Sequence, residues 1–178
     1  KNNKNDTNIL NALGSALLAK GEMKEGISVL EEAIAIAPDN FLLHFNIGNG
    51  YRNLKENDKA INAYQKSIQL NKDFIQSYNN LGNIYLELGQ YEEAIKHLKL
   101  GFEKNPKYYN IITNIAAVFI ATNNLKELLD FIINVFNHNK DNQKVLFSIT
   151  NYLNLLSFKD AKDEIIPVIT SLITNKNL

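Results

Sequence analysis

Side-chain amides recur along this sequence at a fixed spacing. Asn46, Asn80 and Asn114 are 34 residues apart, and Asn49 and Asn83 follow the first two of them by three residues. An asparagine carries both a hydrogen-bond donor and an acceptor, so one side chain can pair with the N–H and the C=O of a peptide backbone. The pattern therefore predicts a neutral row of side chains that can donate and accept hydrogen bonds. Asparagine is abundant throughout the chain, as in AT-rich genomes, which makes such a pattern easier to obtain by chance.

Titratable residues form no catalytic or metal-binding pattern in the sequence. His44, His97 and His138 stand in different segments, and none has a second ligand at metal-binding spacing on one helical face. No serine stands in a nucleophile elbow, and the chain has no cysteine. We therefore predict that the chain is not an enzyme and has no cofactor and no metal site, and we interpret His44 as a half-buried packing residue.

The charge balance and hydropathy restrict the kind of partner. Lysine plus arginine and aspartate plus glutamate number 19 each, whereas nucleic-acid binders carry an excess of cations. The most apolar run, 115–121, is far shorter than the ~18 residues of a membrane span. We expect no nucleic acid partner, no membrane insertion and a cytoplasmic location. Residues 1–6 are polar and lack an initiator Met, so we expect a linker left in a fragment of a larger protein.

A 34-residue repeat organises the chain. One column of small residues runs through Gly14, Gly48, Gly82 and Ala116, and a second through Gly26, Ala60 and Ala94 until it ends at Leu128. Apolar residues within each unit recur three and four positions apart, as on one face of a helix. Short loops at 19–23, 54–58, 88–92 and 122–126 contain Gly or Asn, which suit a left-handed helix cap. Each unit is therefore predicted to be a helix–turn–helix.

The repeated glycines have a packing role in this interpretation. A glycine inside a helix costs roughly 0.5–1 kcal/mol relative to alanine, so Gly82 needs a structural reason. We predict that Gly82 and Ala94 lie where the two helices of a unit cross, which lets a bulky side chain such as Leu98 insert. The alternative, in which Gly48 and Gly50 cradle a phosphate, lacks the strand that precedes such a loop in dinucleotide-binding folds.

These columns resemble the tetratricopeptide-repeat family, whose 34-residue helix pairs carry Leu-Gly, Tyr, Ala, a bulky apolar residue, Ala and Pro in this order. The resemblance implies repeats at 7–40, 41–74 and 75–108, a diverged fourth repeat at 109–142, and a degenerate repeat and C-terminal cap at 143–178. It also implies an all-α, right-handed solenoid that binds a protein or an extended peptide in the concave groove of its first helices.

The resemblance places a row of side-chain amides in that groove: Asn46, Asn49, Asn53, Gln76, Asn80, Asn83, Asn110 and Asn114. Family members that grip a C-terminal carboxylate use lysine and arginine there, and this chain has no cation at the corresponding positions. The groove is more similar to the asparagine ladder of protein O-GlcNAc transferases, in which amides hold the backbone of an extended peptide. Helices ~8–10 Å apart and a peptide rising ~3.3 Å per residue would bring one asparagine to about every third peptide residue.

We therefore predict a non-catalytic protein- or peptide-binding scaffold. Two alternatives stay open: a substrate-recruiting segment of an enzyme such as a protein glycosyltransferase, and a self-associating structural module. The segment 128–136 suggests a homo-oligomer, because Phe131 and Ile133 replace smaller or more polar residues of the other units. We expect the segment 160–173 or a second subunit to cover this apolar face.

Overall fold

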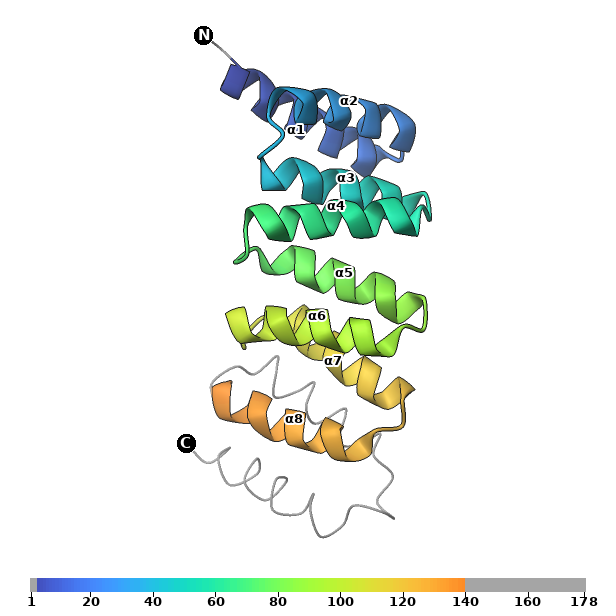
Figure 1. Cartoon of the computed structure of the whole chain (residues 1–178), viewed down its shortest axis with the longest axis vertical. Coiled ribbons are helices and arrows are strands. Elements are labelled where there is room, and N and C mark those ends of the chain that lie inside the picture. Colours follow the sequence, from blue (N-terminus) through green and yellow to red (C-terminus); the bar gives the residue numbers. More distant parts are fainter. Residues whose placement is uncertain (1–2, 140–178) are drawn as a thin grey trace. The chain divides into compact units, whose positions relative to one another are not determined.

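The computed structural model describes residues 3–139, and all regular secondary structure in this range is α-helical. The helices, drawn in Figure 1, are α1 (Asn3–Lys20), α2 (Met23–Ile36), α3 (Phe41–Asn53), α4 (Asn57–Leu70), α5 (Ile75–Glu87), α6 (Tyr91–Lys104), α7 (Tyr109–Ala121) and α8 (Leu125–His138). The chain divides into two compact units, Lys1–Lys104 and Asn105–Leu178.

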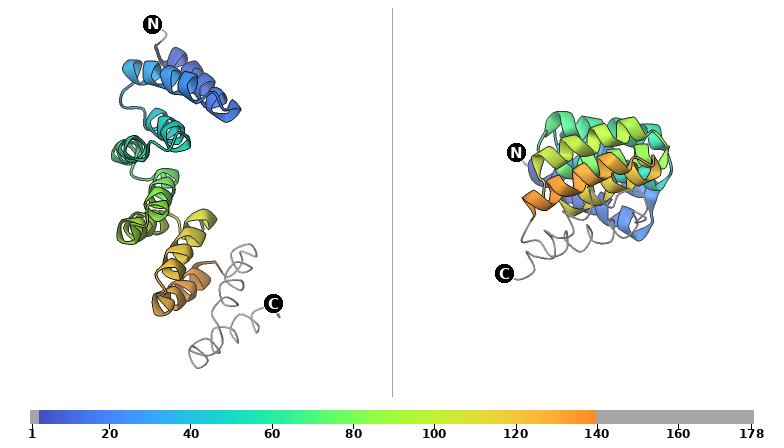
Figure 2. Two further views of the ribbon diagram at one scale, coloured as in Figure 1. Left: turned by 90° about the vertical axis from the view of Figure 1, so that its right-hand side faces the viewer. Right: turned by 90° about the horizontal axis from the view of Figure 1, so that it is seen from below.

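Unit 1 is a stack of three helix pairs. α1 packs on α2, α3 on α4 and α5 on α6, and successive pairs join through contacts of α2 with α3 and of α4 with α5. Figure 2 shows the two helices of each pair lying side by side. In the described part of unit 2, α7 and α8 form one further pair. The predicted all-α solenoid of helix–turn–helix repeats is confirmed.

A close crossing holds each pair of unit 1 together. A Cβ atom added to the glycine of the first helix would come within 2.5–2.8 Å of a side chain of the second helix: Gly14 against Leu30, Gly48 against Tyr64, and Gly82 against Leu98. These three bulky side chains are fully buried. Only a hydrogen atom fits at this point of the first helix, so the predicted packing role of Gly82 is confirmed. Gly48 and Gly50 are buried inside α3, which leaves no phosphate-binding loop there.

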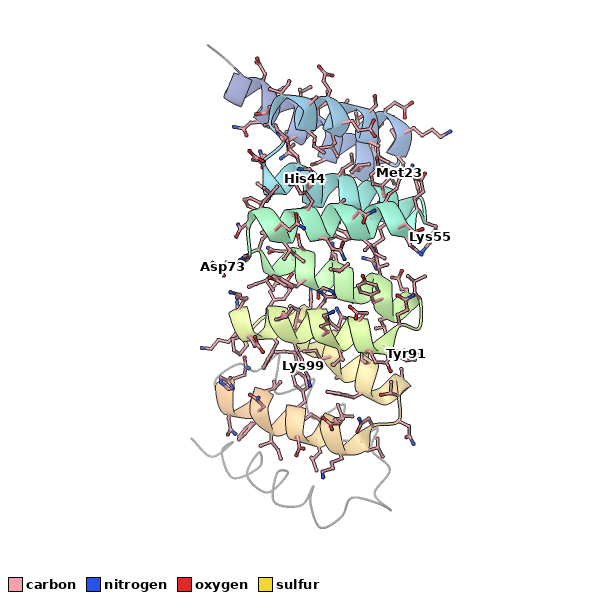
Figure 3. All side chains as sticks on the ribbon, in the orientation of Figure 1. Met23, His44, Lys55, Asp73, Tyr91 and Lys99 are labelled. Atoms are coloured by element: carbon pink, nitrogen blue, oxygen red, sulfur yellow. The ribbon has the colours of Figure 1, made fainter. Side chains whose placement is uncertain are left out.

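The turn inside every pair has the same backbone hydrogen bonds. An N–H reaches the carbonyl oxygen five residues earlier in each of them: Glu22 to Leu17, Glu56 to Tyr51, Gln90 to Tyr85 and Asn124 to Phe119, at 2.8–2.9 Å. The residue before each of these donors has a positive φ: Gly21 at 94°, Lys55 at 62°, Gly89 at 71° and Asn123 at 52°. The prediction of Gly or Asn in this role is wrong for the second loop. The 34-residue register puts Lys55 at the left-handed position (Figure 3), while Asn57 opens α4.

The sequence analysis also made predictions for the two ends of the chain, residues 1–6 and residues 143–178. α1 begins at Asn3 and has Asp6 in its first turn, where a carboxylate favours the helix dipole, so much of the expected linker 1–6 is helical. The degenerate repeat and cap expected at 143–178 lie outside the described residues. Within residues 3–139, no helix has the length and apolar character needed to cross a bilayer.

The two apolar residues that mark the outer face at 128–136 differ in exposure. The Phe131 side chain is only 9% exposed, and its ring centroid lies 6.1 Å from that of Phe119 on α7. Ile133 remains 36% exposed. The segment 160–173, which we expect to cover this face, is outside the described residues.

We predict that Lys55→Gly stabilises the chain by about 0.5–1 kcal/mol. A non-glycine residue in the left-handed conformation costs roughly 1–2 kcal/mol, and the larger unfolded-state entropy of glycine offsets part of the gain. The reverse change at the equivalent position, Gly89→Lys, should destabilise by a similar amount. Urea denaturation followed by circular dichroism measures both, and a loss of stability in Lys55→Gly would contradict this account of the turn.

Candidate functional site

The first helices of unit 1 carry a row of polar side chains that we call the amide face: Asn11 on α1, Asn46 and Asn49 on α3, and Asn80 and Asn83 on α5. All five side chains are half-buried. An amide in this position is in contact with the protein on one side and accessible from the other. The helix pairs position it, because the 34-residue register presents equivalent positions of successive first helices on the same side of the stack.

Hydrogen bonds join these amides from one repeat to the next. Asn46 Nδ2 of α3 donates to Asn11 Oδ1 of α1 at 2.8 Å, and Asn80 Nδ2 of α5 donates to Asn49 Oδ1 of α3 at 2.9 Å. Asn79, which is buried, donates to Asn80 Oδ1 at 3.2 Å. An amide has two N–H donors and a carbonyl with two lone pairs, so Asn11, Asn46 and Asn49 keep hydrogen-bonding capacity beyond the bond to their neighbour.

A buried tyrosine anchors the centre of the amide face. The Tyr64 hydroxyl donates to Asn49 Oδ1 at 2.7 Å, and Asn80 Nδ2 lies 3.4 Å from the same hydroxyl oxygen. Burial raises the pKa of Tyr64 to about 12, so this hydroxyl is protonated at neutral pH and donates. Our sequence analysis missed this role. The available signal was a residue with a polar tip in a column that otherwise reads Leu30, Leu98 and Ile132.

The other residues predicted for the groove are not part of this hydrogen-bonded group of amides. Asn83 makes no side-chain hydrogen bond within the part of the chain that the structure describes. Asn53 is exposed with its Nδ2 3.8 Å from Met23 Sδ, and Gln76 is exposed. Asn110 and Asn114 lie on α7 of unit 2, the first exposed and the second half-buried, whereas the hydrogen-bonded amides above all lie in unit 1.

One ion pair lies beside the amide face. Arg52, the only arginine of the chain, forms an ion pair with Glu87 that links α3 to α5. The neighbouring positions of the first helices carry no cation and hold Asn11, Ser15, Asn46, Gln76 and Asn80. The amide face is therefore neutral and can offer hydrogen bonds but no formal charge to a ligand.

The histidines of the described residues have packing and hydrogen-bonding contacts. His44 is half-buried, as predicted, with its Nε2 2.7 Å from the carbonyl oxygen of Pro38. His97 stacks on Tyr85 with ring centroids 5.5 Å apart, and burial lowers its pKa. Between residues 3 and 139, no group of three or more His, Asp or Glu side chains is arranged to hold a metal ion.

Three family models match the chain. A tetratricopeptide-repeat model matches residues 7–40, another matches 75–108, and a TPR-repeat model matches 48–89. Together these matches span more than half of the sequence. Among curated protein sequences, none matches the chain significantly.

Solved structures of tetratricopeptide-repeat proteins share the fold. A structure of PilF from Pseudomonas aeruginosa has 18% identity and a TM-score of 0.71 over 86% of this chain and 70% of its own. The first TPR of Spaghetti (RPAP3), bound to the HSP90 peptide SRMEEVD, has 21% identity and a TM-score of 0.63. The match covers 66% of this chain and 94% of that structure's chain. A mutant O-GlcNAc transferase from Thermobaculum terrenum has 18% identity and a TM-score of 0.62 over 67% of this chain and 23% of its own.

We predict that Tyr64→Phe lowers stability at pH 7 by about 0.5–1.5 kcal/mol, because Asn49 loses a hydrogen bond in a buried setting. The pKa of Tyr64 is raised from 10.0 to about 12 in the folded chain, so folding favours the protonated hydroxyl. Its contribution is fully present below pH 10 and is lost as the pH rises toward 12. The variant should therefore lose less stability than the parent between pH 10 and 12. Urea denaturation at both pH values measures the free energy of unfolding of the two proteins. If the parent and the variant lost the same stability over this pH range, the assignment of a buried, protonated hydroxyl would be contradicted.

Proposed function

Because the chain belongs to the tetratricopeptide-repeat family, we propose that it is a non-catalytic scaffold that binds the main chain of an extended peptide on its amide face. Repeats of this family are protein-interaction modules. The observation that carries the proposal is the pair of inter-repeat amide bonds, Asn46 to Asn11 and Asn80 to Asn49.

These bonds hold the amides ready for a ligand. Ordering a flexible side chain at an interface costs about 0.5–1.5 kcal/mol, and a side chain already fixed by a neighbour avoids most of that cost. Asn46 uses one N–H for the inter-repeat bond and keeps the second, whereas Asn80 Nδ2 donates both to Asn49 Oδ1 and to the Tyr64 hydroxyl. The Asn83 side chain makes no hydrogen bond to another described residue, so both its N–H groups and its carbonyl oxygen can pair with a ligand. A peptide backbone would thus meet fixed donors and acceptors on α3 and α5.

The neutrality of the amide face favours a ligand that is recognised without charge. The first TPR of Spaghetti (RPAP3) binds SRMEEVD, a peptide with three acidic side chains. The amide face consists of uncharged residues, and Arg52 is engaged by Glu87. Binding here rests on main-chain hydrogen bonds, so its affinity depends little on peptide sequence and on salt.

A second candidate is that these repeats recruit substrate for an enzyme. The supporting observation is the similarity to the Thermobaculum terrenum O-GlcNAc transferase, in which the matched region is 23% of the chain. The complete reading frame around this sequence tests the idea, because a catalytic domain joined to the repeats would support it. An oligomer through 128–136 has less support, since Phe131 is buried and only Ile133 of the two is exposed.

We predict that replacing Asn46, Asn80 and Asn83 together by alanine weakens peptide binding by about 30- to 1000-fold. Each lost hydrogen bond contributes ~0.5–1.5 kcal/mol, and the three losses sum to roughly 2–4 kcal/mol. The loss should be similar for two unrelated extended peptides selected from a random library, and nearly the same in 50 mM and 500 mM salt (roughly the range over which screening changes most). Isothermal calorimetry measures the affinities.

The matched control is Asn62→Ala, which removes an exposed amide from α4, outside the amide face. Circular dichroism at the assay temperature checks that the triple variant is folded, since Asn80→Ala also removes a partner of Asn49. Equal affinities of the parent and the folded triple variant would refute the proposal. Binding that collapses in high salt would point to a charged surface instead.

A further inference from the structure

Two apolar side chains, Leu42 and Phe45, interrupt the polar face of the second repeat. Both lie on α3, the helix that also carries Asn46 and Asn49. Leu42 precedes Asn46 by four positions and Asn49 by seven, and Phe45 precedes Asn49 by four. Residues at these spacings share one face of a helix, so the two apolar side chains lie on the same face of α3 as the amides.

The other repeats have polar side chains at both positions. The column of Leu42 otherwise reads Asn8, Gln76 and Asn110, and the column of Phe45 otherwise reads Asn11, Asn79 and Thr113. The three amides of the first column are exposed, and Leu42 is itself 37% exposed. The position of Leu42 therefore belongs to the surface in all four of these repeats, and packing of the core does not account for a leucine there.

Half-buried aromatic rings surround Phe45. The Phe74 ring centroid lies 5.0 Å from that of Phe45 and 4.8 Å from that of Phe41, edge-to-face in both pairs. On its other side, the Phe45 ring centroid lies 5.9 Å from that of Tyr64, whose hydroxyl anchors the amide face. We call Leu42, Phe41, Phe45 and Phe74 the apolar patch. It continues directly from the amide face.

The ring of Phe74 stands where a polar helix cap stands one repeat earlier. Asn40, the equivalent residue, is the N-cap of α3 and accepts a hydrogen bond from the Leu42 N–H at 3.1 Å. Phe74, at the N-cap of α5, makes no side-chain cap bond. Asparagine is among the best N-cap residues, so phenylalanine forgoes a stabilising bond here and its ring packs in the apolar patch instead. Rings fixed in this way lose little conformational freedom when a ligand packs on them.

We propose that the apolar patch binds one large apolar side chain of the extended peptide whose main chain the amide face holds, an inference that rests on the proposed function. Four residues of helix rise about 6 Å, so Leu42 lies within side-chain reach of a main chain bound at Asn46. Successive side chains of an extended peptide point to opposite sides, so one can enter the apolar patch while its neighbours point away. The peptide thus has one apolar position of leucine or phenylalanine size and is variable elsewhere.

Selection of random peptides on the parent chain tests this preference. The selected peptides should share leucine, isoleucine, methionine or phenylalanine at one position and vary at the others. The same selection on Leu42→Asn, which installs the residue of the first and fourth repeats, should lose the preference. The matched control is Leu100→Asn, which changes a leucine that is 41% exposed on α6, outside the apolar patch, and should keep the preference.

Calorimetry then measures the contribution of the apolar patch. One selected peptide is compared with the same peptide carrying asparagine in place of its apolar residue. In the parent this change should weaken binding by about 5- to 30-fold, as expected for burying part of a leucine-sized side chain. In Leu42→Asn the same change should weaken binding by less than about threefold, because the two substitutions remove one shared contact.

The outcomes separate the apolar patch from the amide face. Selected peptides without an apolar position, or equal losses in the parent and Leu42→Asn, would overturn the apolar patch; the amide face would stand if the triple alanine variant still bound these peptides weakly. Peptides that depend on Leu42 but bind the triple variant as tightly as the parent would support the apolar patch and refute the amide face. A parent that selects no peptide would refute both. Light scattering that shows a dimer of the parent, abolished by Leu42→Asn, would assign the apolar patch to a second copy and overturn the proposal.

Discussion

The close approach of a glycine to a bulky side chain sixteen residues later is the contact on which the rest of this structure depends. In each pair of unit 1 the missing side chain lets the second helix insert a leucine or a tyrosine against the first helix. That contact fixes how the two helices cross, and its recurrence every 34 residues fixes how successive pairs stack. The polar positions of the first helices then fall on one side.

Tyr64 takes part in both the helix crossing and the candidate site. Its ring fills the crossing against Gly48, while its hydroxyl donates to Asn49 beside Asn80. A leucine, as in the first and third pairs, would fill the same space but leave the amides without this anchor.

The sequence was sufficient to predict what depends on the 34-residue register. The helix pairs, the crossing at Gly82 and the position of the amides all follow from columns of equivalent residues. The hydrogen bonds of the amide face do not: Asn46 bonds to a residue 35 positions earlier, and Asn80 to one 31 positions earlier. Such pairs belong to no single column and depend on side-chain rotamers. Lys55 was missed because the fixed turn geometry overrides residue preference.

The most direct test of this account is a double-mutant cycle at the third crossing. Gly82→Leu should destabilise the chain by at least about 1–3 kcal/mol although leucine is the better helix former, because the crossing becomes overpacked. Leu98→Ala alone should destabilise by about 2–5 kcal/mol through the cavity that it leaves. Combined, the two changes should cost less than their sum by at least about 1 kcal/mol, since each fills or empties the same space. Urea denaturation measures all four chains. Additive effects, or a Gly82→Leu variant as stable as the parent, would contradict the crossing.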